Sequence, residues 1–275
     1  MRIGITGATG LVGYPVAARL IDRGHDVTVF GRTPLPGAAH VPWRLGDPGP
    51  DLSGLDHLIH AALSHDRDRY RGGEGDDPAG FTALNLDGTL ALWQAARAAG
   101  VHVVFLSSRA VYDGHPPGTA LHEDLPLAPD SLYGRVKLAA ERALGDGGVS
   151  LRATGVFGPP VPGRRHKWAD LLEAHARGAV VPPGIGTEVH SDDVARAVDL
   201  VMDRRIVGDA LNLSGFVLDR RDLLRTVERL TGRIGPLPPA SDPGTVSEMR
   251  TDRLRALGWL PSGPEAVEAT LRLLI

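Results

Sequence analysis

The chain has 275 residues, of which 42% are hydrophobic, so it can bury a sizeable core in one large domain or in a domain with a smaller lobe. It contains no cysteine, which excludes disulfides, thiolate zinc sites and cysteine nucleophiles. Its 30 basic and 33 acidic residues give a net charge of −3 without a long block of like charge, so we expect neither a nucleic-acid partner nor a membrane partner. No apolar run reaches transmembrane length and no signal-like leader precedes the first expected strand, so the expected location is the cytoplasm.

Short apolar segments of strand length alternate with longer segments of helical period in the first half of the chain. The expected strands, which are rich in Val, Ile and Leu, span residues 2–6, 26–30, 57–62, 102–107 and 150–152. Helical spacing is found over residues 11–23, 81–99 and 132–144, and each segment is followed by a glycine where a helix stop is expected. This alternation predicts an α/β fold, with a doubly wound parallel sheet of the Rossmann type and helices on both faces.

Three glycines with the spacing G-x-x-G-x-x-G, Gly7, Gly10 and Gly13, follow the first expected strand and open the first expected helix. Without side chains they let backbone N–H groups approach a pyrophosphate at the positive helix end, and Gly13 allows close packing of helix on strand. Turns of this kind also occur for packing alone. In the context of strand, turn and helix, the motif favours a bound dinucleotide.

After residue 152 the pattern loosens into stretches rich in Gly and Pro, with shorter helices expected at 166–177, 192–203 and 219–231. We therefore expect a dinucleotide-binding domain over residues 1–152. Residues 153–275 are expected to form a smaller lobe, mainly for substrate, with segments that return to the first domain. Residues 67–80 have the most biased composition and are expected to form a loop.

Tyr133 and Lys137 lie four residues apart in an expected helix, so they share one face and the ammonium can stabilise a phenolate. The alternative is an amphipathic helix with a surface aromatic and a solvated lysine. Ser108 follows the strand expected at 102–107, where strand ends face the ligand crevice, and its hydroxyl can bond a substrate oxygen. Together the three side chains indicate acid–base chemistry on a bound alcohol or carbonyl.

Five segments, TGATGLVG, SSRAVY, YGRVKLAAE, LRATGVFGP and HSDDVARA, resemble the blocks of one family in their order. On the basis of these segments, the chain resembles the extended short-chain dehydrogenase/reductases of the NAD-dependent epimerase/dehydratase type. The resemblance covers nearly the whole chain. The resemblance implies that Tyr133 is the catalytic acid/base, that Lys137 holds the nicotinamide ribose, and that Ser108 orients the substrate oxygen. The other cofactor contacts expected on this basis are Gly7, Thr9, Gly10, Leu11, Val12, Asp47, Ala61, Ala62, Ser107 and Val156.

The end of the second strand bears on the choice of cofactor. NAD enzymes of this fold usually place Asp or Glu there to bind the ribose hydroxyls, whereas this chain has Gly31, Arg32 and Thr33. A guanidinium fits a 2′-phosphate, and no carboxylate is present to repel that phosphate. NADP is therefore the favoured cofactor. NAD is the alternative, with Arg32 stacked on the adenine or pointing into solvent.

Four consecutive side chains, Arg164, Arg165, His166 and Lys167, lie in the segment that corresponds to the family's substrate loop. They can clamp an anionic substrate through charge-assisted hydrogen bonds, and a solvated basic loop is the alternative. Gly155 stands where many sugar-nucleotide epimerases carry an Asn, which weakens the case for a nucleotide-sugar ligand.

Arg109 and His190 are further candidates for substrate contact, with a surface salt bridge and a structural histidine as the respective alternatives. Asp192 and Asp193 are expected to be the N-cap and first-turn residues of a helix. None of the eleven histidines has the spacing H-E-x-x-H, and no serine lies in a G-x-S-x-G elbow. We therefore expect no metal site and no hydrolase chemistry.

Three functions remain open from the sequence. The first is an NADP-linked oxidoreductase that transfers a hydride between nicotinamide and a carbonyl or alcohol carbon of a small, anionic or sugar-like substrate. The second is an epimerase of a sugar or nucleotide sugar with tightly bound NAD. The third is a non-catalytic dinucleotide sensor, against which the intact catalytic set argues. The resemblance also implies a homodimer formed through the helices expected at 81–99 and 132–144.

Overall fold

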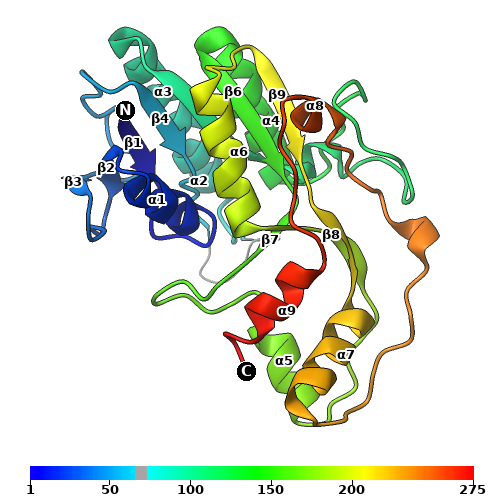
Figure 1. Cartoon of the computed structure of the whole chain (residues 1–275). Helices are drawn as coiled ribbons and strands as arrows, with labels where there is room; N and C mark the ends of the chain where they lie inside the picture. The colour runs from blue at the N-terminus through cyan, green and yellow to red at the C-terminus, as the bar shows by residue number, and fades with distance from the viewer. Residues whose placement is uncertain (66–72) are drawn as a thin grey trace.

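The computed structural model describes residues 1–65 and 73–275. Its centre is a parallel sheet of seven strands in the order β3-β2-β1-β4-β5-β6-β9 (Figure 1). The strands are β1 (Arg2–Thr6), β2 (Asp26–Gly31), β3 (Ala39–Pro42), β4 (His57–His60), β5 (His102–Ser108), β6 (Gly148–Ala153) and β9 (Asp209–Leu213). Because the chain runs outward through β2 and β3 and then returns to β4, the order reverses between β1 and β4. Ligands of doubly wound sheets bind in the crevice at such a point.

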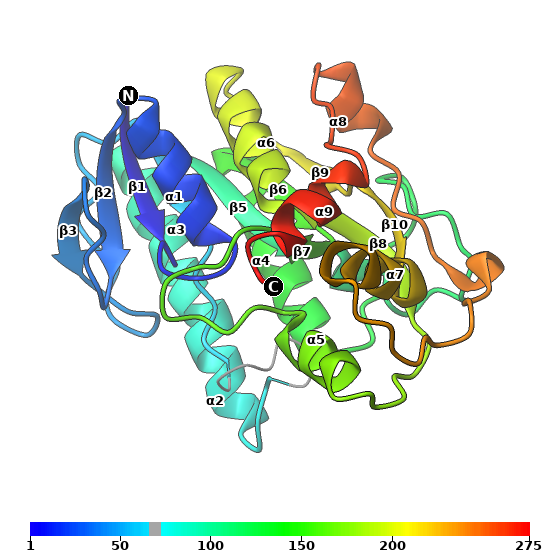
Figure 2. The same cartoon turned by 60° about the horizontal axis from the view of Figure 1, so that its bottom comes forward.

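Helices cover both faces of this sheet, which confirms the predicted fold (Figures 1 and 2). On one face α1 (Gly13–Asp22) packs beside α6 (Ser191–Asp203), and on the other α3 (Gly88–Ala99) packs beside α4 (Leu132–Leu144). Each pair of helices encloses its own apolar cluster, represented by Val198 on one face and by Trp93 and Phe105 on the other. Trp93 Nε1 donates a hydrogen bond to the Ala140 carbonyl at 3.1 Å, so this indole joins α3 to α4 within one chain.

Two predictions in the first half differ from the structure. The strand expected at 57–62 ends at His60, and the helix expected at 81–99 is built from α2 (Pro78–Thr82), a π-helical segment (Ala83–Asp87) and α3. Asn85 lies in the π-helical segment and is buried, and its amide both accepts from the Ser64 N–H and donates to the Ser64 carbonyl, each at 2.7 Å. Of the loop expected at 67–80, residues 67–72 lie outside the described residues, and α2 begins at Pro78.

A second, three-stranded sheet has the order β10-β8-β7, with β7 (Gly155–Phe157) parallel and β10 (Phe216–Asp219) antiparallel to β8 (Ile185–His190). The sequence did not predict these strands. The remaining helices are α5 (Ala169–Ala176), α7 (Arg220–Thr231), α8 (Asp252–Ala256) and α9 (Glu265–Leu271). Phe157, Trp168 and Leu223 belong to an apolar cluster that joins β7, α7 and α9. Two elements of the second half, α6 and β9, pack with the first sheet.

The start of α6 differs from the sequence expectation. The cap is His190, whose Nδ1 accepts a hydrogen bond from the Asp192 N–H at 3.3 Å, while Asp193 is fully buried. The Asp193 carboxylate accepts hydrogen bonds from the backbone N–H and the hydroxyl of Ser262, both at 2.9 Å, and pairs with Arg196. This carboxylate therefore fastens the segment that leads to α9 onto α6.

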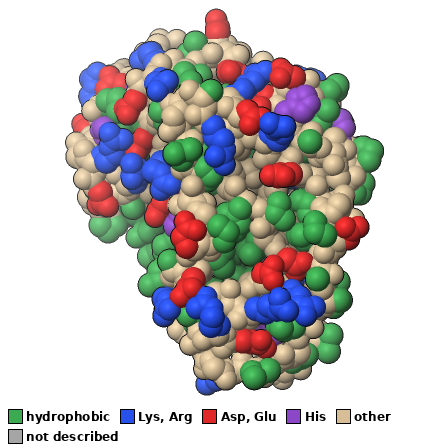
Figure 3. All heavy atoms as spheres, turned by 45° about the vertical axis from the view of Figure 1, so that its right-hand side comes forward, with side chains coloured by type: hydrophobic (Ala, Val, Ile, Leu, Met, Phe, Trp, Pro, Cys, Tyr) green, Lys and Arg blue, Asp and Glu red, His purple; other side chains and the backbone are tan. Residues whose placement is uncertain are grey.

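The surface shows mixed charge. On the face in Figure 3, acidic and basic side chains are interspersed, in agreement with the small net charge. In the part of the chain that the structure describes, no helix has the length and apolar character needed to cross a membrane. Within the same residues, no group of three or more His, Cys, Asp or Glu side chains is arranged to hold a metal ion.

Candidate active site

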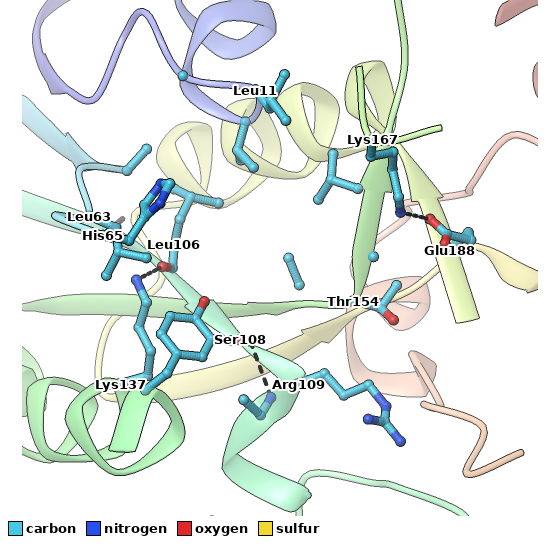
Figure 4. Close-up of a pocket in the computed structure, with 18 of the residues that line it drawn as sticks. Leu11, Leu63, His65, Leu106, Ser108, Arg109, Lys137, Thr154, Lys167 and Glu188 are labelled. Atoms are coloured by element: carbon cyan, nitrogen blue, oxygen red, sulfur yellow. Dashed lines mark hydrogen bonds and ion pairs between the residues drawn. The ribbon is translucent and has the colours of Figure 1, made fainter. Parts of the chain in front are cut away.

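A cleft of about 2290 Å³ opens at the carboxyl ends of β1, β4 and β5 and extends to the second sheet. Its walls include the glycine-rich loop, the end of β5, the start of α4, and residues of β7 and β8. In Figure 4, Lys137 and Ser108 lie on one side of the cavity, and Lys167 and Glu188 lie on the opposite side. The predicted cofactor-binding and substrate-binding halves therefore face one space.

At Gly7 and Gly13 the glycine-rich loop lies too close to neighbouring backbone for a side chain to fit. Gly7 has a φ of 72°, and a Cβ there would lie 2.5 Å from the Ala61 carbonyl carbon. A Cβ on Gly13 would lie 2.2 Å from the Gly7 carbonyl oxygen. The loop therefore passes directly over the end of β4 and leads into α1, whose N-terminal N–H groups favour an anion. The predicted contacts that line the cleft here are Gly7, Thr9, Gly10, Leu11, Val12, Ala61 and Ala62.

Tyr133 is positioned by the way α4 begins. The Ser131 hydroxyl oxygen caps the helix by accepting a hydrogen bond from the Gly134 N–H at 3.0 Å. A Cβ on Gly134 would lie 2.5 Å from the Ala110 carbonyl oxygen, so the absence of a side chain lets α4 pack directly on the backbone that follows β5. As a result, Tyr133 on α4 and Ser108 on β5 both line the cleft. The sequence did not point to Gly134.

Lys137 lies buried beneath the tyrosine. Its Nζ donates a hydrogen bond to the Leu106 carbonyl at 2.8 Å and lies 5.8 Å from the centre of the Tyr133 ring. Burial lowers the pKa of Lys137 to about 8, and the nearby Glu141 carboxylate opposes this shift. The geometry agrees with the predicted pairing, because a cation is held against the side chain that would move a proton.

The two serines at the end of β5 have different surroundings. The Ser108 hydroxyl oxygen accepts a hydrogen bond from the Ala110 N–H at 3.1 Å, which leaves its O–H able to donate toward the cleft. Ser107 Oγ is buried and has no hydrogen-bond partner among the described residues, although Ser107 also lines the cleft. A buried hydroxyl without a partner calls for a polar group supplied by a ligand. Together with the glycine cradle, Ser107 fits a dinucleotide.

Of the other predicted cofactor contacts, some line the cleft and one does not. Arg32 is exposed at the end of β2 and lines the cleft, and Val156 lines it from β7. Asp47 is not among the lining residues. Its carboxylate accepts a hydrogen bond from the Arg44 N–H at 3.0 Å and so closes a local turn.

The basic cluster of the second half does not converge on one point. Arg164 Nε donates a hydrogen bond to the Thr9 carbonyl at 3.0 Å, whereas the Arg165 guanidinium pairs with Asp170 and Glu173. His166 bonds the Gly158 carbonyl through Nε2 at 3.1 Å. These side chains therefore have different partners within the chain, although Arg164, Arg165 and Lys167 all line the cleft.

The two remaining substrate candidates also have partners within the chain. Arg109 lines the cleft and pairs with Asp113 at 2.7 Å. His190 is not among the lining residues, because its ring caps α6 and packs against Phe157 with 5.2 Å between ring centres. The structural alternative for His190 therefore agrees with its position.

The sequence did not point to Glu188, which lies in β8 across the cavity from Ser108 and Lys137 (Figure 4). Its Oε2 lies 2.5 Å from Lys167 Nζ, and burial raises the pKa of Glu188 although Lys167 opposes the shift. A Cβ on Gly155 would lie 2.8 Å from Glu188 Oε2, so the glycine makes room for this carboxylate. The sequence feature that could have pointed to Glu188 is Gly155, because a glycine stands there where many sugar-nucleotide epimerases carry an asparagine.

Comparison with known proteins agrees with this geometry. The sequence pattern of the NAD-dependent epimerase/dehydratase family matches residues 3–214. A UDP-glucose 4-epimerase of Rhizobium meliloti is 27% identical over 300 residues, covering 94% of this chain and 91% of the relative. A dTDP-4-dehydrorhamnose reductase of Sinorhizobium fredii is 27% identical over 221 residues, covering 78% and 71%.

Among solved structures, MoeE5 in complex with UDP-glucose and NAD superposes with a TM-score of 0.82 and 25% sequence identity. The superposition covers 100% of this chain and 98% of that one. The match spans both the sheet that carries the glycine-rich loop and the lobe that carries Glu188. By its sequence pattern and its fold, the chain belongs to the NAD-dependent epimerase/dehydratase family of short-chain dehydrogenase/reductase enzymes.

Proposed function

We propose that the chain transfers a hydride between NADP and a carbonyl or alcohol carbon of a small sugar-like substrate. The observation that carries this proposal is the meeting of Tyr133, Lys137 and Ser108 with a dinucleotide cradle in one cleft. When bound, the nicotinamide ring supplies or accepts the hydride. The chain's own residues bind and orient the reactants and move the proton.

Tyr133 exchanges a proton with the substrate oxygen as the carbon is reduced or oxidised. Lys137 keeps positive charge close to the Tyr133 ring, and its bond to the Leu106 carbonyl fixes the position of the ammonium. The Ser108 hydroxyl donates to the same substrate oxygen and so orients the reacting carbon. Tyr133 and Ser108 come from elements held together by the close approach at Gly134.

Arg32 supports NADP as the preferred dinucleotide. It is exposed at the end of β2 and lines the cleft, in the position from which side chains of this fold contact the adenosine ribose. A guanidinium there binds a 2′-phosphate in bidentate fashion. NAD, which is bound in the MoeE5 structure, is the competing cofactor.

A second candidate is epimerisation of a nucleotide sugar with NAD held through the cycle. The full-length similarity to UDP-glucose 4-epimerases favours this candidate. In an epimerase the hydride returns to the same carbon from the other side, so no dinucleotide is consumed. The same three catalytic side chains serve both reactions.

The deciding experiment titrates protein freed of nucleotide with NADPH and with NADH, following nicotinamide fluorescence. We expect tighter binding of NADPH, and we expect Arg32→Gln to weaken NADPH about tenfold or more while leaving NADH within about twofold. Bound NAD that cannot be removed, or a preference for NADH, would overturn the NADP assignment. NMR of UDP-glucose incubated with the enzyme then tests the second candidate, through inversion at C4 without net oxidation of cofactor.

We also propose that the enzyme is a cytoplasmic homodimer. Its lack of cysteine suits a reducing compartment, and the outward sides of α3 and α4 would form the interface. Trp93 would not contribute to the interface, because it is buried within the chain. Sedimentation velocity over a range of concentrations tests the assembly.

A further inference from the structure

We propose that Arg164 binds a phosphate group of the dinucleotide, so that the C-terminal lobe supplies part of the cofactor site. The inference rests on the proposed dinucleotide function and extends it to a residue outside the first 152. It also revises the sequence expectation, which placed Arg164 at the substrate. Three features of Arg164 support it: the turn that presents the side chain, its contact with Thr9, and its charge.

A rigid turn presents the Arg164 side chain. The Arg164 N–H donates a hydrogen bond to the Val161 carbonyl at 3.0 Å, with Pro162 and Gly163 at the two central positions. Proline sets the first central residue of such a turn, and Gly163 supplies the positive φ, here 69°, that the second requires in a type II turn. Val161 is buried and anchors the turn to the protein. The turn formed by the sequence VPGR thus fixes the position of the Arg164 backbone, from which the side chain extends.

The arginine reaches the glycine-rich loop. Arg164 Nε donates to the Thr9 carbonyl at 3.0 Å, across a separation of 155 residues. Figure 2 shows the connection between β7 and α5 extending to the start of α1. Thr9 lies between Gly7 and Gly10, in the loop whose backbone and following helix attract a phosphate. The guanidinium therefore lies beside the phosphate position, with further N–H donors and an exposed side chain.

The charge of Arg164 is available for this role. Its neighbours Arg165 and Lys167 are paired with carboxylates, whereas the hydrogen-bond partner of Arg164 is an uncharged carbonyl. Among the described residues, no carboxylate forms an ion pair with Arg164. A cation without a counter-charge next to a phosphate site gains a charge-assisted, bidentate contact when the phosphate arrives.

Two phosphate groups of the ligand share this chemistry, the pyrophosphate and the 2′-phosphate of NADP. Since both dinucleotides carry the pyrophosphate and one alone carries the 2′-phosphate, binding of NADH and NADPH distinguishes them. We expect the Arg164 contact also to slow dinucleotide release, because a charge-assisted contact with the phosphate must break before the dinucleotide leaves.

The test compares the wild type with Arg164→Met and with Arg165→Met, a matched change one residue away whose charge is already paired. Affinities for NADPH and NADH are measured by fluorescence titration, and release rates by stopped-flow displacement with excess NADP⁺. We expect Arg164→Met to weaken NADPH about tenfold or more, mainly by faster release, as the loss of one charge-assisted contact predicts. Arg165→Met should stay within about twofold of the wild type.

The outcomes separate the possibilities. Weakened binding of both dinucleotides assigns Arg164 to the pyrophosphate, and weakened binding of NADPH alone assigns it to the 2′-phosphate. Equal affinities for Arg164→Met and the wild type overturn the inference, as does an equal loss in both variants. If the wild type binds neither dinucleotide, the proposed function itself fails. If Arg164→Met binds both dinucleotides with the wild-type affinity and release rate, the inference about Arg164 is wrong, whereas the proposed function is unaffected.

Discussion

His60 makes the stability of the fold sensitive to acid. Its Nδ1 lies 2.7 Å from Thr6 Oγ1 and its Nε2 lies 3.0 Å from Thr89 Oγ1, in the middle of the sheet. Burial, helped by the charge of Lys137, lowers the pKa of His60 from 6.5 to about 3. Between pH 6.5 and about pH 3, the His60 imidazole is therefore mostly neutral in the folded chain and mostly protonated in the unfolded chain.

The sign and size of the effect come from this difference in pKa. Above pH 6.5 neither state is protonated at His60, so its contribution to stability is complete. Below pH 6.5 the unfolded chain binds a proton and the folded chain does not, so the free energy of unfolding falls by about 1.4 kcal/mol per pH unit. At pH 4.5 the loss attributable to His60 is about 3 kcal/mol, and it levels off below about pH 3 at about 5 kcal/mol.

The assay is urea unfolding at pH 7.5 and pH 4.5 for the wild type, His60→Gln and Thr89→Val. His60→Gln lowers stability at pH 7.5, but should lose about 3 kcal/mol less than the wild type on acidification. Thr89→Val removes one hydrogen-bond partner and keeps the imidazole. Because burial is the main cause of the shift, this variant should retain the wild-type loss. Equal losses for His60→Gln and the wild type would refute the reasoning.

Three further changes test the site and the core. Gly13→Ala places a Cβ 2.2 Å from the Gly7 carbonyl oxygen and should abolish dinucleotide binding in the fluorescence titration, so unaltered affinity would contradict the cradle. Tyr133→Phe should lower turnover by about 10²-fold or more while dinucleotide affinity stays the same, and turnover at the wild-type rate would remove Tyr133 from its role. Glu141→Gln leaves the buried Arg152 guanidinium without its carboxylate, 2.8 Å away in the wild type. It should cost about 3–5 kcal/mol in urea unfolding, and a loss below about 1 kcal/mol would show that Arg152 finds another partner.

The central strands and helices could be predicted because their patterns are local. Strands buried on both faces read as continuous apolar runs, and α4 begins and ends at the predicted residues. The sequence did not predict β3, β7, β8, β9 and β10, for a different reason. β3 is a mostly exposed edge strand, and β8 mixes Gly, Thr and Glu with apolar residues. Such segments become strands by pairing with distant neighbours, which a local pattern does not record.

The same distinction holds for the site. The glycines and the pair Tyr133 and Lys137, which the structure places in one cleft, could be predicted because each chemistry lies within one short motif. Glu188 and the contact of Arg164 with Thr9 depend on segments far apart in the chain, so neither is visible in the sequence. Asp47 was predicted as a cofactor contact from the motif resemblance alone, and what the structure shows of its carboxylate is a local turn closed with the Arg44 N–H.

The return of α6 and β9 to the first sheet has a consequence for synthesis of the chain. While only the first half has left the ribosome, β6 presents an unpaired edge, and the apolar face that Val198 covers is open to solvent. Both are closed only when residues 191–213 emerge. The nascent chain therefore passes through a period in which it exposes a strand edge and apolar surface, the features that chaperones bind and that drive aggregation.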